Sequence, residues 1–131
     1  MALRCFIVDD NPLFLEASRN LLELEGINVV GVASTSKEAL GDVAEHRPEV
    51  VLVDIELGEE SGFDLTRRIA GMERVTPTTI LVSSHLESDF EDLIEASPAV
   101  GFLPKGELSA KAIRDLLRSA AASRGNGEIQ P

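Results

Sequence analysis

Five residues, placed after four apolar runs of this sequence, carry side chains that could perform chemistry together. Asp9 and Asp10 follow one apolar run, Asp54 follows a second, Ser83 follows a third and Lys105 follows a fourth. Carboxylates that lie close together raise each other's pKa unless a cation compensates their charge. Carboxylate oxygens without a neighbouring histidine or cysteine suit a hard divalent ion such as Mg²⁺, which prefers oxygen ligands. The residue types therefore predict a magnesium site.

A divalent cation and a lysine around a carboxylate favour phosphoryl transfer. That chemistry depends mostly on positioning the reactants and on neutralising the charge of the transferred group. A carboxylate can itself be the nucleophile, in which case an aspartyl-phosphate forms. We therefore expect a Mg²⁺-assisted phosphoryl-transfer site, provided that the chain brings these residues to one place.

Each of these residues has an ordinary structural explanation when it is taken alone. The aspartate pair could cap the helix that follows it, and Asp54 could be a turn residue. Ser83 could be a hydroxyl satisfied by its neighbours, and Lys105 a solvated loop charge. Their joint placement after successive apolar runs is what favours a shared site.

The elements that must position these residues alternate between short apolar runs and helical patterns. The predicted strands are residues 3–8, 28–33, 50–53, 79–82 and 100–103. The predicted helices are residues 13–24, 36 to the turn before Pro48, 62–70, 87–96 and 108–120. Five repeats of this alternation indicate parallel strands joined by crossover helices. In such a sheet, ligands bind beyond the carboxyl ends of the strands, where the residues above are placed.

Length and composition limit the remaining possibilities. With 131 residues the chain forms one domain, which we place at residues 1–122, and residues 123–131 are expected to be a flexible tail or linker stub. A net charge of −11 disfavours direct binding of nucleic acid, and no apolar run is long enough to span a membrane. The single cysteine, Cys5, lies in an apolar run, which predicts a buried, inert thiol. Without a secretory signal we expect the cytoplasm.

The spacing of the site residues matches a known pattern. The intervals are 44 residues from Asp10 to Asp54, 29 from Asp54 to Ser83 and 22 from Ser83 to Lys105. With Asp9, this set resembles the receiver domain of two-component response regulators, and the resemblance covers residues 3–122. It implies an α/β, flavodoxin-like (βα)5 doubly wound parallel sheet in strand order 2-1-3-4-5. Two helices would cover one face of this sheet and three the other.

The resemblance also implies a role for each residue. Asp54 is similar to the phosphoacceptor and Asp10 to the direct Mg²⁺ ligand, with Asp9 acting largely through water. The backbone carbonyl of Glu56 would be a further ligand of the ion. Ser83 resembles the switch hydroxyl that hydrogen-bonds the phosphoryl group.

Further positions follow from the same resemblance. Lys105 would pair with the phosphoryl group, and Phe102 is similar to the aromatic residue that changes rotamer when Ser83 moves. Glu56 and His85 occupy positions that govern access of water to the acyl phosphate, so they are expected to tune its lifetime. One departure from the family pattern is Gly58, which stands where a proline is usual.

The resemblance predicts a signalling switch, phosphorylated by a histidine kinase. The face formed by the fourth helix, fifth strand and fifth helix would then bind a partner or form a homodimer. The stretch around Lys105 resembles NarL/LuxR-type receivers, so transcription regulation is expected if a helix-turn-helix domain follows in a longer protein. The alternatives are a phosphorylation-independent interaction module and an aspartyl-nucleophile phosphohydrolase. The hydrolase would need a second aspartate where Glu56 stands.

Overall fold

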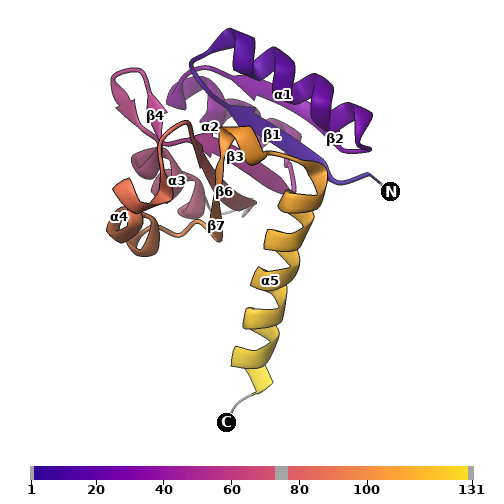
Figure 1. Ribbon diagram of the computed structural model, residues 1–131, viewed down its shortest axis with the longest axis vertical. Helices are drawn as coiled ribbons and strands as arrows, with labels where there is room; N and C mark the ends of the chain where they lie inside the picture. Colours follow the sequence, from indigo (N-terminus) through magenta and orange to yellow (C-terminus); the bar gives the residue numbers. More distant parts are fainter. Residues whose placement is uncertain (1, 73–76, 130–131) are drawn as a thin grey trace.

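The computed structural model describes residues 2–72 and 77–129, with side chains described to residue 122. Its centre is a five-stranded parallel sheet in the order β2-β1-β3-β6-β7, and a two-stranded antiparallel hairpin, β4-β5, lies beside it (Figure 1). The elements are β1 (Arg4–Val8), α1 (Pro12–Leu24), β2 (Asn28–Ala33), α2 (Ser36–His46), β3 (Val50–Asp54), β4 (Glu56–Leu57), β5 (Glu60–Ser61), α3 (Gly62–Ala70), β6 (Thr78–Ser83), a 3₁₀ turn (Glu87–Asp89), α4 (Glu91–Ala96), β7 (Gly101–Pro104), a second 3₁₀ turn (Lys105–Glu107) and α5 (Ala110–Ile129).

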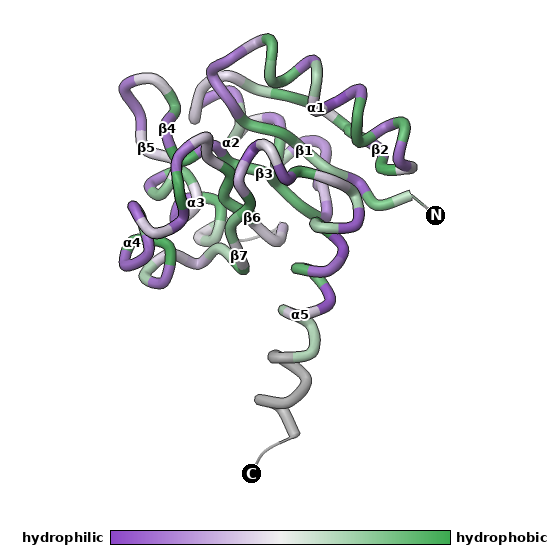
Figure 2. The backbone as a smooth tube through the Cα atoms, viewed as in Figure 1, coloured by the Kyte–Doolittle hydropathy of each residue, from purple (hydrophilic) through white to green (hydrophobic). Residues whose placement is uncertain are grey.

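The helices pack against the two faces of the sheet through two apolar cores. Along β1, Phe6 and Val8 join the core that contains side chains of α2, α3 and α4, whereas Cys5 and Ile7 join the core of α1 and α5. Strands covered on both faces consist of continuous apolar residues, and these segments form the interior of the molecule in Figure 2. The predicted fold, strand order and division of helices are therefore confirmed.

Helix α1 has its own capping residue, which leaves the preceding aspartates free for another purpose. The side chain of Asn11 accepts a hydrogen bond from the backbone N–H of Leu13 at 3.0 Å, and Pro12 occupies the first turn. Asn is among the preferred N-cap residues, and proline fits the first helical position. The alternative explanation of Asp9 and Asp10 as the cap of this helix is therefore wrong.

The segment predicted as one helix over residues 87–96 is divided. A 3₁₀ turn covers Glu87–Asp89 and α4 covers Glu91–Ala96, with Phe90 between them in a non-helical conformation. The ring of Phe90 packs against Phe63 of α3 with centroids 6.2 Å apart. This contact ties Phe90 to the core side of the segment, which explains why the helix begins only after it.

The hairpin β4-β5 was not predicted. Its turn contains Gly58, whose φ of 60° lies in the left-handed region. Glycine adopts this region without strain, and proline cannot. The departure at Gly58 from the usual family residue is therefore part of a defined turn, and the loop expected here is an ordered hairpin.

Helix α5 begins later and continues further than predicted. Leu108 is buried but precedes the helix, and Ile113 is the fully buried residue of its first turns instead of Ala112. The backbone stays helical to Ile129, and the yellow end of α5 extends away from the sheet (Figure 1). The part of the predicted flexible tail or linker stub, residues 123–131, that the structure describes is thus helical, and residues 130–131 lie outside the described residues. The boundary between receiver and linker stays a prediction.

Among the described residues, no helix combines the length and apolar character needed to cross a bilayer.

Cys5 is expected to be unreactive in the folded protein. Its side chain is fully buried in β1, and this burial raises the pKa of the thiol to about 12. Because the thiolate is the reactive form, a thiol-specific disulfide reagent should label no cysteine in the native protein and one cysteine per chain in urea. Labelling of the native protein as fast as that of a free thiol would contradict the assignment.

Candidate functional site

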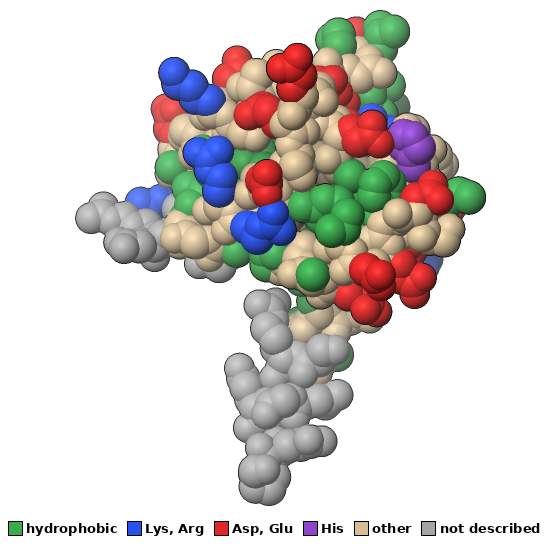
Figure 3. Space-filling view, turned by 90° about the vertical axis from the view of Figure 1, so that its left-hand side faces the viewer, with side chains coloured by type: hydrophobic (Ala, Val, Ile, Leu, Met, Phe, Trp, Pro, Cys, Tyr) green, Lys and Arg blue, Asp and Glu red, His purple; other side chains and the backbone are tan. Residues whose placement is uncertain are grey.

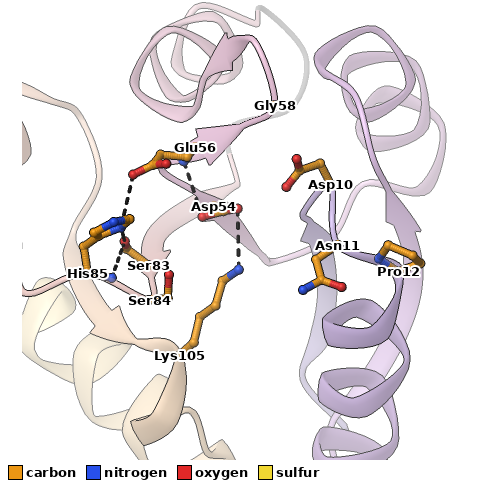
Figure 4. A pocket seen from close by; sticks show the side chains of 10 residues that line it. All are labelled: Asp10, Asn11, Pro12, Asp54, Glu56, Gly58, Ser83, Ser84, His85 and Lys105. Carbon is orange, nitrogen blue, oxygen red and sulfur yellow. Dashed lines mark hydrogen bonds and ion pairs between the residues drawn. The ribbon is translucent and has the colours of Figure 1, made fainter.

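The predicted site residues meet at one edge of the sheet, where β1, β3, β6 and β7 end. Except for the buried Asp9 and for Phe102, they line a cleft of about 480 Å³, seen from close by in Figure 4. Its lining residues are Asp10, Asn11, Pro12, Asp54, Glu56, Gly58, Ser83, Ser84, His85 and Lys105. The position of the cleft agrees with the rule that parallel sheets bind ligands beyond the carboxyl ends of their strands.

Asp9 is completely buried beneath the cleft. One of its carboxylate oxygens, Oδ1, accepts a hydrogen bond from the backbone N–H of Asn11 at 2.9 Å. The other, Oδ2, lies 2.7 Å from Nζ of Lys105 but makes no well-aligned hydrogen bond within the described chain. A buried carboxylate oxygen that is paired in charge but not fully hydrogen-bonded has capacity for another donor or a cation.

Asp54 is nearly buried at the end of β3. One carboxylate oxygen accepts a hydrogen bond from the backbone N–H of Glu56 at 3.3 Å, and the other lies 3.5 Å from Nζ of Lys105. Burial, followed by the negative charge of Asp9, raises the pKa of Asp54 to about 6, although Lys105 and the Glu56 N–H oppose the rise. The positive charge around Asp54 therefore does not fully compensate the burial of its carboxylate and the charge of Asp9.

Lys105 lies between the buried carboxylates and the solvent. Its ammonium group contacts Asp9 and Asp54 and lies 4.5 Å from the centre of the Phe14 ring. Burial alone would lower the pKa of Lys105, but the close ion pairs with the two aspartates outweigh it and raise the pKa. Figure 4 shows the side chain extending across the cleft toward Asp54. Lys105 is thus a fixed cation next to the carboxylate.

Three carboxylates are arranged as a cation would require. Oxygen atoms of Asp9, Asp10 and Asp54 all lie within 4.8 Å of one another. Mg²⁺ binds oxygen at about 2.1 Å, so opposite ligands are about 4.2 Å apart and small side-chain movements would suffice. The Asp9 oxygen without a hydrogen bond and the raised pKa of Asp54 both favour a bound cation at this place. The donor set therefore fits the predicted ion.

The hydroxyl of Ser83 contacts His85, in the turn that follows β6. Its hydroxyl oxygen accepts a hydrogen bond from the backbone N–H of His85 at 2.9 Å. The ring atom Nδ1 of His85 lies 3.1 Å from Oε1 of Glu56 and 3.5 Å from the hydroxyl of Ser83. Dashed lines in Figure 4 mark these interactions. The two residues predicted to tune the lifetime of the acyl phosphate therefore contact each other at the mouth of the cleft.

Phe102 is placed differently from the other site residues. It is 8% exposed, belongs to the core beneath α2, α3 and α4, and does not line the cleft. Its neighbour across the sheet is Leu81 of β6, the strand that carries Ser83. Core packing accounts for this position, and the rotamer switch stays a prediction.

No functional role was predicted from the sequence for Asn11 or Gly62. Asn11 orients Asp9 through its backbone and caps α1 through its side chain, and the Asn-Pro step at the helix start could have indicated this role. Gly62 packs so tightly against the backbone of Asp54 that a Cβ atom would lie 2.0 Å from the carbonyl oxygen. Only the three-dimensional path of the chain reveals this contact.

Comparison with protein families matches residues 5–118 to the family described as response regulator receiver domain. The chain belongs to the response regulator receiver domain family.

Individual relatives place this receiver among proteins with different outputs. It is 33% identical over 128 residues to a protein-glutamate methylesterase/protein-glutamine glutaminase of Syntrophus aciditrophicus, covering 92% of this chain and 36% of that protein. Response regulator GacA of Pseudomonas viridiflava is 28% identical, covering 93% of this chain and 57% of that protein. A solved LuxR-family response regulator from Aurantimonas superposes with a TM-score of 0.79 at 26% identity, covering 93% and 87% of the two chains. The receiver thus spans only part of the length of these curated relatives.

Proposed function

We propose that this receiver accepts a phosphoryl group on Asp54 from a histidine kinase and works as a signalling switch. The observation that supports this most is the position of Asp54, nearly buried at the base of the cleft with Lys105 and two further aspartates around it. A carboxylate held in a sparsely compensated site, open to solvent on one side, is suited to act as a nucleophile.

In the transfer step, an ionised oxygen of Asp54 attacks phosphorus and forms an acyl-phosphate bond. The bond from phosphorus to the donor atom breaks, and its electron pair leaves with the donor. Asp54 is mainly ionised at neutral pH, because its raised pKa of about 6 is still below 7. The N–H of Glu56 holds one oxygen of Asp54 in place, and Lys105 provides positive charge beside the other.

Asp10 and Asp54 would hold Mg²⁺ together with the backbone carbonyl of Glu56, and Asp9 would act largely through water. When bound, the ion supplies the positive charge that offsets the carboxylates and the phosphoryl oxygens. The exposed side chain of Asp10 can adjust to such a ligand, whereas Asp9 is fixed by the N–H of Asn11.

The signal would arise when Ser83 and Lys105 rearrange toward the new phosphoryl group. Its added charge favours the conformations in which both contact it, so that the population of the face formed by α4, β7 and α5 shifts. Phe102, on the strand next to Ser83, would change rotamer in that shift. The outcome would be a homodimer or a complex with a partner. Glu56 and His85 would set the lifetime of the acyl phosphate.

Two outputs have support from the relatives, and both would lie in a longer cytoplasmic protein. The LuxR-family neighbour favours transcription regulation, whereas the methylesterase relative favours control of an attached enzyme. The receiver itself would be a phosphoacceptor that promotes only its own phosphorylation and dephosphorylation, without direct nucleic-acid binding. The phosphohydrolase alternative has less support, because Glu56 is exposed and faces His85.

Intact-mass spectrometry after incubation with acetyl phosphate, with and without Mg²⁺, tests this proposal. The expected result is a Mg²⁺-dependent gain of one phosphoryl group. If incubation with acetyl phosphate, and then with phosphorylated kinases of the same organism, gives no gain, the interaction module becomes the better explanation.

Lys105→Ala is expected to uncouple phosphorylation from the conformational response. The nucleophile remains, so phosphoryl uptake should persist, but the cation that pairs with the product is lost. Uptake is measured by mass, and the response by the change in association on light scattering. Lys111→Ala is a matched control, because Lys111 is exposed on α5 and pairs only with Asp115 among the described residues. An undiminished response in Lys105→Ala would contradict the prediction.

A further inference from the structure

His85 contacts two parts of the receiver at once. On one side it lies at the cleft, where its backbone N–H donates to Ser83 and its ring atom Nδ1 lies 3.1 Å from Glu56. On the other side its ring meets the ring of Phe90 edge-on, with centroids 6.0 Å apart and an angle of 85°. His85 therefore joins the candidate switch hydroxyl to the beginning of α4.

Phe90 is the main attachment of the start of α4. Neither the 3₁₀ turn before it nor α4 after it has a side-chain cap in the described structure, and none of the described residues of α4 is buried. The ring of Phe90 packs between His85 and Phe63 of α3, at 6.0 and 6.2 Å respectively. Within α4, Ile94 is the described residue that packs against the same core, so the first turn depends mainly on Phe90 and should follow a shift of its ring.

Phe63 and Phe90 line a shallow groove between the β4-β5 hairpin and α4, with a volume of about 300 Å³. Its lining includes Glu56 of the hairpin, Phe63 of α3, Phe90, and Leu93 of α4. Figure 3 shows the side of the molecule that carries α3, α4 and β4, on which an apolar patch is bordered by acidic side chains. Glu56 belongs to both the cleft and the groove, so the two share a wall.

We propose that His85 is a positioning residue that transmits the state of the phosphoacceptor cleft to Phe90, and through Phe90 to α4 and the groove. The inference rests on the proposed function, because it requires Ser83 to move toward a phosphoryl group. When Ser83 turns toward the ligand, the N–H of His85 loses its acceptor and the contact of the ring with Glu56 is disturbed. The ring then shifts against Phe90, and α4 follows. This route is separate from the one predicted for Phe102, which lies in the core.

Because the chain has five phenylalanines, one ¹³C NMR spectrum of labelled phenylalanine rings can follow this route. With ¹³C at the ζ position of each ring, Phe14 reports on Lys105, Phe90 and Phe63 report on the groove, and the fully buried Phe6 is an internal reference. Mg²⁺ and beryllofluoride, which imitates an acyl phosphate, serve as the probe at saturation. In the unmodified protein, the signals of Phe14, Phe63 and Phe90 are expected to shift, and that of Phe6 is not.

In His85→Ala at saturating beryllofluoride, the Phe14 signal should still report an occupied cleft even where the affinity has changed, and the shifts of Phe90 and Phe63 should be lost. His85→Phe keeps an aromatic edge against Phe90 and should restore them, which a general loss of stability would not do. His46→Ala is the matched control, since His46 lies on α2 outside the cleft and the groove.

Other outcomes separate this inference from the proposed function. Unchanged shifts of Phe90 and Phe63 in His85→Ala, or no shifts of these rings in the unmodified protein while Phe14 responds, would overturn the role of His85. A loss that His85→Phe does not restore would also overturn it. If no ring responds, Phe14 included, the proposed phosphoacceptor site itself fails.

Discussion

Asp54→Asn is expected to abolish phosphoryl uptake from acetyl phosphate while leaving the fold intact. The amide has the same shape as the carboxylate, and its oxygen can still accept the hydrogen bond from the N–H of Glu56. A neutral amide, however, has no negative oxygen to attack phosphorus and gives a cation less to bind. Because nucleophile and ligand are lost together, no gain of mass should be detected even at high Mg²⁺.

Asp64→Asn is the matched control for this substitution. Asp64 lies in the first turn of α3, is exposed, and pairs with Arg67 on the same helix. The same change of charge and shape is therefore made outside the cleft, and uptake should equal that of the unmodified protein. Uptake by Asp54→Asn at an undiminished rate would show that another group accepts the phosphoryl.

The layered fold was predictable because, in most of the chain, the local apolar pattern agrees with the burial of that segment in the fold. The strands are continuous apolar runs, which indicates burial on both faces, and this pattern needs no knowledge of neighbouring strands. The strand order could not be predicted in this way, because hydrophobic periodicity does not show which strands are neighbours. It was predicted from the family resemblance. The site residues were found for a related reason: Asp9, Asp54 and Ser83 adjoin or end strands, and the carboxyl ends of parallel strands share one edge.

The errors lie where a tertiary contact decides the local structure. The acidic residues from Glu87 onward have helical spacing, but the contact of Phe90 with Phe63 interrupts the helix. The stripe from Leu108 includes Ala112, yet Ile113 is the residue that enters the core, because the helix begins only at Ala110. The direction in which the hydroxyl of Ser83 points could not be predicted, since it depends on the turn that follows β6.

Gly62→Ala is expected to cause the largest loss of stability. A Cβ atom at Gly62 would lie 2.0 Å from the carbonyl oxygen of Asp54 and 2.8 Å from its carbonyl carbon and from Cα of Ile55. All three atoms belong to the backbone, so no side chain can rotate to make room. The N–H of Gly62 also donates to the carbonyl of Ile55 at 2.7 Å, which ties α3 to the end of β3. Relief of the clash would stretch this bond, and overpacking alone costs roughly 1–3 kcal/mol.

Urea denaturation measures this effect, and Gly41→Ala is the control of opposite sign. Gly41 lies within α2, and a Cβ there would meet nothing within 4 Å, so alanine should stabilise the protein by about 0.5–1 kcal/mol. Equal midpoints for Gly62→Ala and the unmodified protein would show that α3 can move away from β3 freely. Since the clash is with the carbonyl group of Asp54, the variant should also take up phosphoryl groups more slowly where it remains folded. A loss of stability at an unchanged rate of uptake would mean that the Asp54 side chain is positioned independently of α3, by Lys105 and the N–H of Glu56 alone.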